Sequence, residues 1–89
     1  MIVEFDKSFV KWLAKIKDKS VLLRIENVIL TIENSETISK LKGVEKISGF
    51  KKYFRIRSGD YRIGFEKISG NKIVLIIVAH RSEIYKIFP

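Results

Sequence analysis

Three arginines stand close together around one short turn, in Arg57–Glu66 (RSGDYRIGFE) and just before it. Arg57 and Arg62 flank a Ser-Gly-Asp turn, and Arg55 lies two residues upstream. Like charges that face each other across neighbouring strands are destabilising. Guanidinium groups offer planar pairs of donors that suit a phosphate. The cluster therefore favours an anion site over ordinary surface arginines, although Glu66 is an alternative neutralising partner.

Further groups capable of chemistry lie in the final segment, HRSEIYKIFP. His80 is a candidate general acid or base, because histidine is the residue type that titrates nearest neutrality; the alternative is a structural role. Arg81 adds a fourth guanidinium. Tyr85 can stack on a nucleobase and present its hydroxyl, or simply cover the edge of a sheet. A single histidine and the lack of cysteine argue against a metal site built by the protein.

A period of two predicts the strands that carry the arginines, at residues 53–57 and 61–66. The turn between them is either 58–59 or 59–60, both two-residue loops of a kind that hairpins favour. A turn at 58–59 places Arg55 opposite Arg62, whereas a turn at 59–60 places Arg57 opposite Arg62. Both pairings have the same parity, so all three arginines share one face.

The opposite, apolar face of this hairpin should carry helices. Gly64, on the arginine face, should leave room beside the guanidiniums. A second hairpin, turning at Ser69–Asn71, leads into Lys72–Ala79 (KIVLIIVA), whose continuous apolar run suits a central strand. A two-residue turn there places His80 on the core side, whereas a three-residue turn places it beside Arg62.

The N-terminal half predicts a strand over Met1–Phe5 and two amphipathic helices. Asp6 is a plausible N-cap of the first helix, and the second ends at about Asn34. Ser35–Gly49 is polar and irregular, and three of its lysines either line a nucleic-acid groove or belong to a solvated loop: Lys40, Lys42 and Lys46.

These elements predict one α+β domain over residues 1–89, with the order β-α-α-β-β-β. We expect a twisted, mainly antiparallel sheet of four strands, with the helical hairpin packed on one face. The first strand should neighbour the strand at Lys72–Ala79.

The composition favours a polyanionic partner. Eighteen Lys and Arg against ten Asp and Glu give a net charge of +8, which suits nucleic acid or an acidic protein segment, although it can also serve solubility alone. No apolar run is long enough to span a bilayer, and the N-terminus lacks the basic start of a signal peptide. We therefore expect a cytoplasmic protein that does not bind membranes.

Two elements together resemble the RelE/ParE toxin superfamily of toxin–antitoxin systems: the run YFRIRSGDYRIGFE, and the terminal HRSEIYK that follows an apolar strand. The N-terminal strand and helical hairpin fit the same family, so the resemblance covers essentially the whole chain. The RelE branch is the better match, because its members typically end in this Arg–Tyr element. The ParE branch, which poisons DNA gyrase, usually does not.

The resemblance implies a toxin that cleaves mRNA in the ribosomal A site, without metal or cofactor, and that is neutralised by an antitoxin. The ribose 2′-hydroxyl attacks the adjacent phosphate, which requires a base, an acid and cations. By position, the resemblance implies catalytic roles for five residues: Arg62, Tyr85, Arg55, His80 and Arg81. Four more would bind RNA, which here means mRNA and ribosomal RNA: Arg57, Tyr53, Lys51 and Lys52.

The departures from the RelE pattern concern proton transfer. Tyr53 stands where the prototype has a second strand lysine, and a further basic position falls on Ala79 or His80. Arg55 is a poor general base because guanidinium does not deprotonate near neutral pH; His80 can compensate. Two alternatives stay open: a toxin that binds gyrase, and a catalytically silent member that binds only RNA or its antitoxin.

Overall fold

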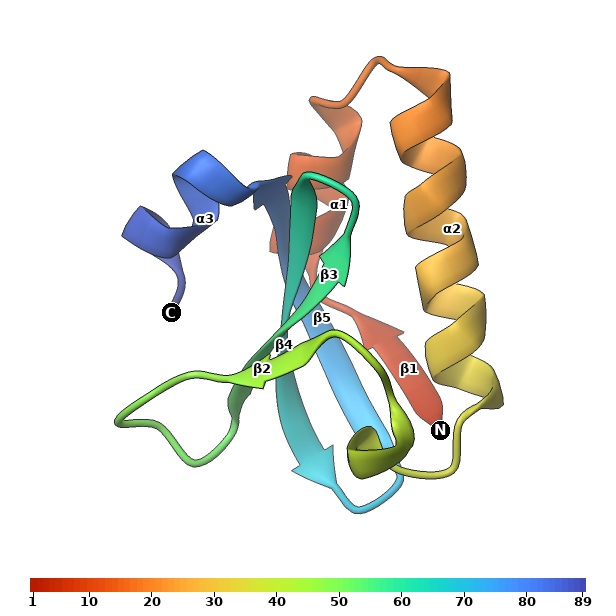
Figure 1. The fold of residues 1–89 in the computed structure, drawn as a ribbon, viewed down its shortest axis with the longest axis vertical. Helices are drawn as coiled ribbons and strands as arrows, with labels where there is room; N and C mark the ends of the chain where they lie inside the picture. Colours follow the sequence, from red (N-terminus) through yellow and green to blue (C-terminus); the bar gives the residue numbers. More distant parts are fainter.

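The computed structural model describes all of residues 1–89. Its centre is a single mixed sheet (Figure 1). Its five strands are arranged in the order β1-β5-β4-β3-β2. They comprise β1 (Ile2–Phe5), β2 (Val44–Lys46), β3 (Tyr53–Ser58), β4 (Tyr61–Ser69) and β5 (Lys72–His80). β1 runs parallel to β5, and all other neighbours are antiparallel. The predicted α+β class and the pairing of the first strand with the apolar strand are therefore confirmed.

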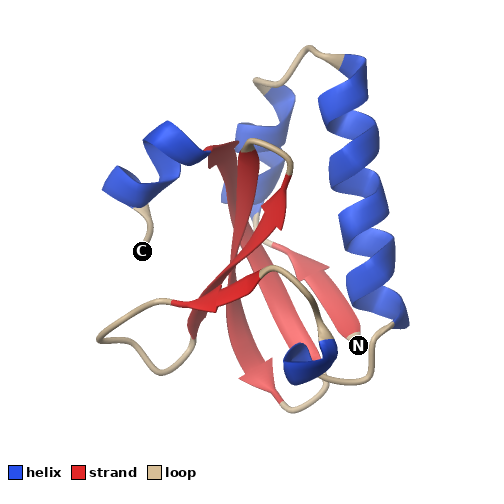
Figure 2. Cartoon of the chain, viewed as in Figure 1, coloured by secondary structure: helices blue, strands red, loops and turns tan.

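Helices lie on both sides of this sheet. They are α1 (Lys7–Ala14), α2 (Lys19–Asn34), the short 3-10 helix η1 (Ile38–Lys40) and α3 (Arg81–Ile87). Figure 2 shows α3 separated from α2 by the strands. The predicted cap of α1 is confirmed, because the Asp6 carboxylate accepts a hydrogen bond from Ser8 N at 3.0 Å. No helix combines the length and the apolar character needed to cross a membrane.

Two apolar clusters hold the layers together. The larger joins α1 and α2 to one face of the sheet, as the sequence predicts, and its buried residues are Phe9, Ile25, Ile32, Ile56, Ile63, Phe65, Ile73, Leu75 and Val78. The smaller joins α3 and the segment after β2 to the opposite face, through Ile47, Ile77, Ala79, Ile84 and Phe88. The arginine face is thus partly covered by a helix that the sequence analysis did not predict.

The prediction of four strands is wrong, because β2 lies within the segment expected to be irregular. With three residues, β2 is too short to show an alternating pattern, and its pairing with β3 defines it as a strand. α3 was missed for a similar reason. It has seven residues, of which Ile84 alone is fully buried, so it offers no repeated apolar stripe.

The registers of both hairpins decide between the alternatives that the sequence left open. In the first, Ser58 pairs with Tyr61 and Arg57 with Arg62, so the turn is Gly59-Asp60. Gly59 has φ +60°, the positive value that a type II′ turn requires at its first central residue. In the second hairpin, Ser69 pairs with Lys72, which makes the two-residue turn Gly70-Asn71.

Candidate functional site

The three hairpin arginines meet at one small cavity. Arg55, Arg57 and Arg62 line a hollow of about 150 Å³ together with Tyr85 of α3 and, from β2 and the residue before it, Gly43, Val44 and Glu45. The prediction that the arginines share one face is therefore confirmed. The structure also brings Tyr85 to them, because α3 folds back over the sheet after β5.

Arg62 is positioned by the turn that it follows. Its Nη1 donates to the carbonyl oxygens of Gly59 and Tyr61, both at 2.8 Å. No protein acceptor bonds its Nε or Nη2, so these donors are available to an anion. Across the strand pair, Arg57 lies directly opposite. Two guanidiniums in this arrangement repel each other unless an anion lies between them.

Arg55 is largely enclosed, with 15% of its side chain exposed. Its guanidinium forms an ion pair with the carboxylate of Glu45 on β2. On the other side it lies 4.7 Å from the centre of the Tyr85 ring, within cation–π distance. Its Nε is buried without a hydrogen-bond partner. Arg55 is thus held between β2 and α3, the two elements that the sequence analysis missed.

Gly64 has a different role from the one predicted. It pairs with Arg55 across the hairpin, but the space above it does not open beside the guanidiniums. A Cβ built on Gly64 would lie 2.7 Å from the Phe88 ring and 2.6 Å from Ile77 Cγ2. The glycine therefore makes room for Phe88, which follows α3 and holds that helix against the sheet.

His80 is not brought to the arginine cavity. It pairs with Tyr61 on the side of the sheet that α1 and α2 cover, as expected for the two-residue turn. It lines a separate cavity of about 200 Å³ with residues that include Trp12 and Glu83. Its Nδ1 accepts a hydrogen bond from Ser82 N at 3.1 Å and so caps α3. His80 also lies edge-on to the ring of Tyr61 at 5.6 Å, so it contacts both α3 and the strand that carries Arg62.

Arg81 and Tyr85 both lie on α3. Residues four apart on a helix emerge on the same side, so Arg81 lies one turn before Tyr85. The backbone N–H of Arg81 donates to the carbonyl oxygen of Asp60 at 2.8 Å, which ties the start of α3 to the arginine hairpin. Tyr85 is 53% exposed, so part of the residue is accessible to a ligand.

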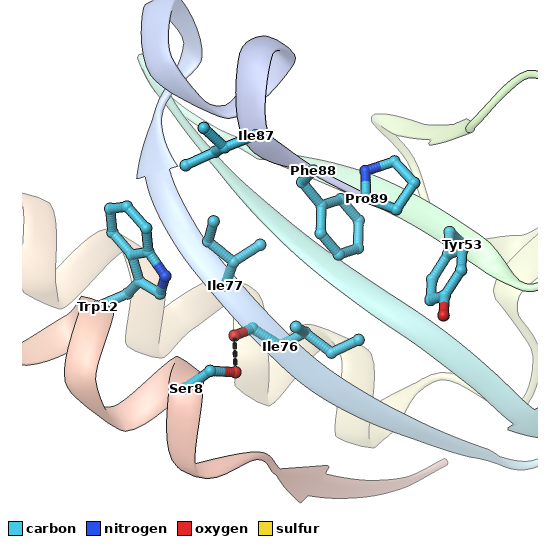
Figure 3. A pocket seen from close by; sticks show the side chains of 8 residues that line it. All are labelled: Ser8, Trp12, Tyr53, Ile76, Ile77, Ile87, Phe88 and Pro89. Atoms are coloured by element: carbon cyan, nitrogen blue, oxygen red, sulfur yellow. Dashed lines mark hydrogen bonds between the residues drawn. The ribbon is translucent and has the colours of Figure 1, made fainter.

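Tyr53 packs in an aromatic series at some distance from the cavity. Its ring lies 5.7 Å from that of Phe88 and 5.6 Å from that of Phe50, both edge-on. It also lines an apolar pocket of about 340 Å³ between α1, β5 and the residues after α3 (Figure 3). Lys51 and Lys52 are exposed on the loop between β2 and β3.

Glu45 is the site residue that sequence reasoning missed. It is the one carboxylate that lines the arginine cavity, and it pairs with Arg55 both in the strand register and through its side chain. The sequence offered one weak signal, since a lone acidic residue stands between Lys42 and Lys46. Without β2, nothing placed that residue beside the arginines.

Comparison with known proteins matches this arrangement to one family. Residues 3–85 match the family described as ParE toxin of type II toxin-antitoxin system, parDE. Toxin RelE3 of Methanocaldococcus jannaschii is 41% identical over 90 residues, with both chains covered completely. The RelE chain in the RelB–RelE antitoxin–toxin complex from Methanococcus jannaschii is 40% identical, with a TM-score of 0.76 over 97% of this chain and 99% of that one.

A more distant archaeal structure shares the fold. In the RelE–RelB complex from Pyrococcus horikoshii OT3, the matching chain is 22% identical, with a TM-score of 0.70 over 92% of this chain and 96% of that one. The full-length identity and the family match agree with the arginine hairpin and the terminal Arg–Tyr element. The chain therefore belongs to the ParE/RelE family of toxins of type II toxin–antitoxin systems.

Proposed function

We propose that this toxin is a ribosome-dependent endoribonuclease that cleaves mRNA in the A site. The observation that carries the proposal is the cavity in which three guanidiniums, one carboxylate and one phenol converge. Phosphodiester cleavage by the neighbouring 2′-hydroxyl needs a base, an acid and cationic stabilisation of the phosphorane-like transition state. Residues on β2, β3, β4 and α3 offer all three kinds of group within one hollow.

Two arginines are suited to hold the scissile phosphate. Arg62 has Nε and Nη2 free of protein acceptors, and Arg57 lies directly across from it. Planar pairs of N–H donors match the two non-bridging phosphate oxygens. A phosphate between these groups would also remove their mutual repulsion, so binding and charge neutralisation reinforce each other.

Glu45 is the cavity group suited to accept the proton of the 2′-hydroxyl. A carboxylate has oxygens that accept a proton as the 2′-oxygen attacks, whereas guanidinium cannot give up a proton to serve as a base. As the 2′-oxygen bonds to phosphorus, its proton passes to Glu45 and the bond from phosphorus to the 5′-oxygen breaks. Tyr85 carries a phenolic proton that can pass to that leaving oxygen. The products are a 2′,3′-cyclic phosphate and a free 5′-hydroxyl.

His80 enters this scheme as a positioning residue. It caps α3 and lies on the other side of the sheet from the cavity, so we propose that it holds the helix that carries Tyr85. Arg81, one turn before Tyr85, is placed to contact the RNA backbone beside the cut. Arg55 orients Tyr85 through its ring contact and can add positive charge to the transition state.

Replacement of Arg62 by alanine tests the site. Because one well-placed donor contributes roughly 3–4 kcal/mol to a transition state, we expect Arg62→Ala to cleave mRNA on programmed ribosomes at least 100-fold more slowly. Loss of the hydrogen bonds from Arg62 to the carbonyl oxygens of Gly59 and Tyr61 lowers the stability of the fold, whereas relief of the repulsion from Arg57 raises it. The free energy of unfolding should therefore change by no more than about 1 kcal/mol.

Arg24→Ala is the matched control, because it removes the same charge from α2 beside the same turn but outside the cavity. Toeprinting of mRNA in a purified translation system measures cleavage. If Arg62→Ala retained activity within a few-fold of wild type, the site would be wrongly assigned. Cleaved DNA complexes with purified gyrase, in place of cut mRNA, would identify a gyrase poison instead. A protein with neither activity would be a silent member that binds only RNA or its antitoxin.

Glu45→Gln tests the proposed base separately. The amide keeps the size of the side chain but cannot act as a base, so cleavage should slow by roughly 10²- to 10⁴-fold. Binding to programmed ribosomes should persist or tighten, since the loss of a negative charge frees Arg55 to contact phosphate. Wild-type single-turnover rates in Glu45→Gln would exclude Glu45 as the base.

We also propose that an antitoxin encoded with this toxin binds it in the cytoplasm. The archaeal RelE relative is described in complex with RelB. A positively charged cavity is a natural site for an acidic side chain of such a partner, because the pairing would mask the arginines. Co-expression with the neighbouring reading frame, followed by co-purification and loss of mRNA cleavage, checks this proposal. A partner that fails to co-purify would exclude it.

A further inference from the structure

The loop between β2 and β3 carries a second concentration of groups that suit RNA. Lys46, Ile47, Ser48, Gly49, Phe50 and Lys51 line a hollow of about 440 Å³. Figure 1 shows this loop extending from the sheet toward the same side of the picture as α3. Two lysines and no acidic residue line the hollow. Its charge therefore favours a polyanion over a neutral ligand, and the exposed ring of Phe50 favours nucleic acid over an acidic protein segment.

Phe50 is the feature that needs an explanation. The residue is 46% exposed although it carries the largest apolar group of the loop. One edge is supported, because its ring lies 5.6 Å from that of Tyr53 at an interplanar angle of 66°. The loop backbone is also fixed, by Gly49 at φ +85° and by a hydrogen bond of 3.2 Å from Phe50 N to Ile47 O. The ring is thus held in place while part of its surface is free.

The position of this ring relates it to the arginine cavity. Tyr53, which supports Phe50, lies on the same face of β3 as Arg55 and two residues before it. Two residues of a strand span roughly 7 Å. A single-stranded RNA that places one phosphate at the arginines can therefore extend along β3. A nucleobase close to that phosphate along the RNA then reaches Phe50.

We propose that Phe50 is a stacking platform for an unpaired nucleobase that flanks the cut, with Lys46 and Lys51 contacting the adjoining backbone. This inference rests on the proposed ribonuclease function and extends it to a second RNA contact. Proteins that bind single strands combine basic side chains with exposed aromatic rings, and each stacked base contributes about 1–3 kcal/mol. Stacking needs no particular base, so the contact would add affinity without adding sequence preference.

Binding of variants to programmed ribosomes tests the platform. The mRNA carries a 2′-O-methyl group at the cut position, which blocks the attack and leaves a stable complex. Phe50→Ala should weaken binding by about 5- to 150-fold, whereas Phe50→Trp should bind like wild type. Phe50→Leu keeps apolar bulk against Tyr53 but lacks a π face, so it should bind like Phe50→Ala. Phe5→Ala is the matched control, since Phe5 is 50% exposed on β1, at the other edge of the sheet.

Abasic substitutions in the mRNA locate the stacked base. In wild type, one abasic position near the cut should weaken binding by the same factor as Phe50→Ala, and in Phe50→Ala that substitution should have no further effect. Equal binding by Phe50→Ala and Phe5→Ala would overturn the platform and leave the ribonuclease function standing. If Phe50→Ala lost antitoxin binding but bound ribosomes normally, the hollow would be a protein-docking surface and the inference would be wrong. If wild type neither bound nor cut on ribosomes, the proposed function would fail and the platform with it.

Discussion

Gly64→Ala should dislodge α3 from the sheet without touching any arginine. The new methyl group would lie 2.6 Å from Ile77 Cγ2 and 2.7 Å from two atoms of the Phe88 ring. These distances are about 0.7 to 0.8 Å shorter than the 3.4 Å at which ordinary contact begins. Ile77 is β-branched and sits in the middle of β5, so it has little freedom to move. Phe88, just beyond α3, is the group that gives way.

The loss of stability in Gly64→Ala can be estimated from the packing of Phe88, which holds α3 against the sheet. Overpacking of a core costs about 1–3 kcal/mol, and full loss of the burial of one phenyl ring lies in the same range. For a domain of this size, each kcal/mol lowers the melting temperature by roughly 4–8 °C. As Phe88 leaves, α3 loses its anchor and Tyr85 no longer rests against Arg55. We therefore expect mRNA cleavage in Gly64→Ala to fall by at least tenfold beyond the loss of folded protein.

Thermal unfolding and single-turnover cleavage of Gly64→Ala measure these two effects. Gly70→Ala is the matched control, because a Cβ there meets nothing within 4 Å and the backbone φ is not positive. Phe88→Ala completes a double-mutant cycle, in which the two substitutions should be strongly non-additive if the clash is with Phe88. Additive losses, or full activity in Gly64→Ala at temperatures where it is folded, would refute the idea that Phe88 positions Tyr85.

Three further predictions concern charge and capping. Binding to ribosomes or RNA should weaken steeply as salt rises, because displaced counterions drive such association; affinity that is flat between low and physiological salt would argue against phosphate contacts. His80→Asn should keep near-wild-type cleavage because asparagine is a good N-cap, whereas His80→Ala should lose about 0.5–2 kcal/mol of stability; a 100-fold loss of activity in both would make His80 a proton donor after all. The hydrogen bond from the Ser20 side chain, followed by backbone bonds to Ser20 and Val21, lowers the pKa of Asp18 below its ordinary value of 3.8. Because the folded pKa is the lower one, the stability from this cap is present above pH 3.8 and is lost as the pH falls through the folded pKa. Asp18→Asn keeps a capping group without a charge, so its melting temperature should fall less steeply in acid than that of wild type; identical slopes would show that this carboxylate does not contribute.

The arginine hairpin could be predicted from the sequence because its information is local. Alternation with a period of two fixes which side chains share a face, and that result survives a change of turn. The register needed the structure, because Ser58-Gly59 and Gly59-Asp60 are both acceptable loops. Gly59, with its positive φ, selects the second.

Glu45 and Phe88 could not be predicted because their information is non-local. β2 exists through its pairing with β3, and α3 is held by the packing of Ile84 and of Phe88, just beyond it, on the sheet. Neither segment is long enough to show a period of its own. The sequence therefore predicts the arginines that we propose to bind an anion, but not the carboxylate beside them or the contact that holds Tyr85 in place.

The pairing of β1 with β5 joins the beginning of the chain to a strand near its end. Ile2 pairs with Lys72, seventy residues later in the chain, and such long-range contacts slow folding because a large loop must close first. During synthesis β1 cannot pair until β5 has emerged from the ribosome, and α3 is made after β5. Tyr85 therefore reaches Arg55 after the sheet is complete. A nascent chain therefore lacks the contact between Arg55 and Tyr85 throughout most of its synthesis, so the site that we propose to cut mRNA is completed only when the chain is nearly finished.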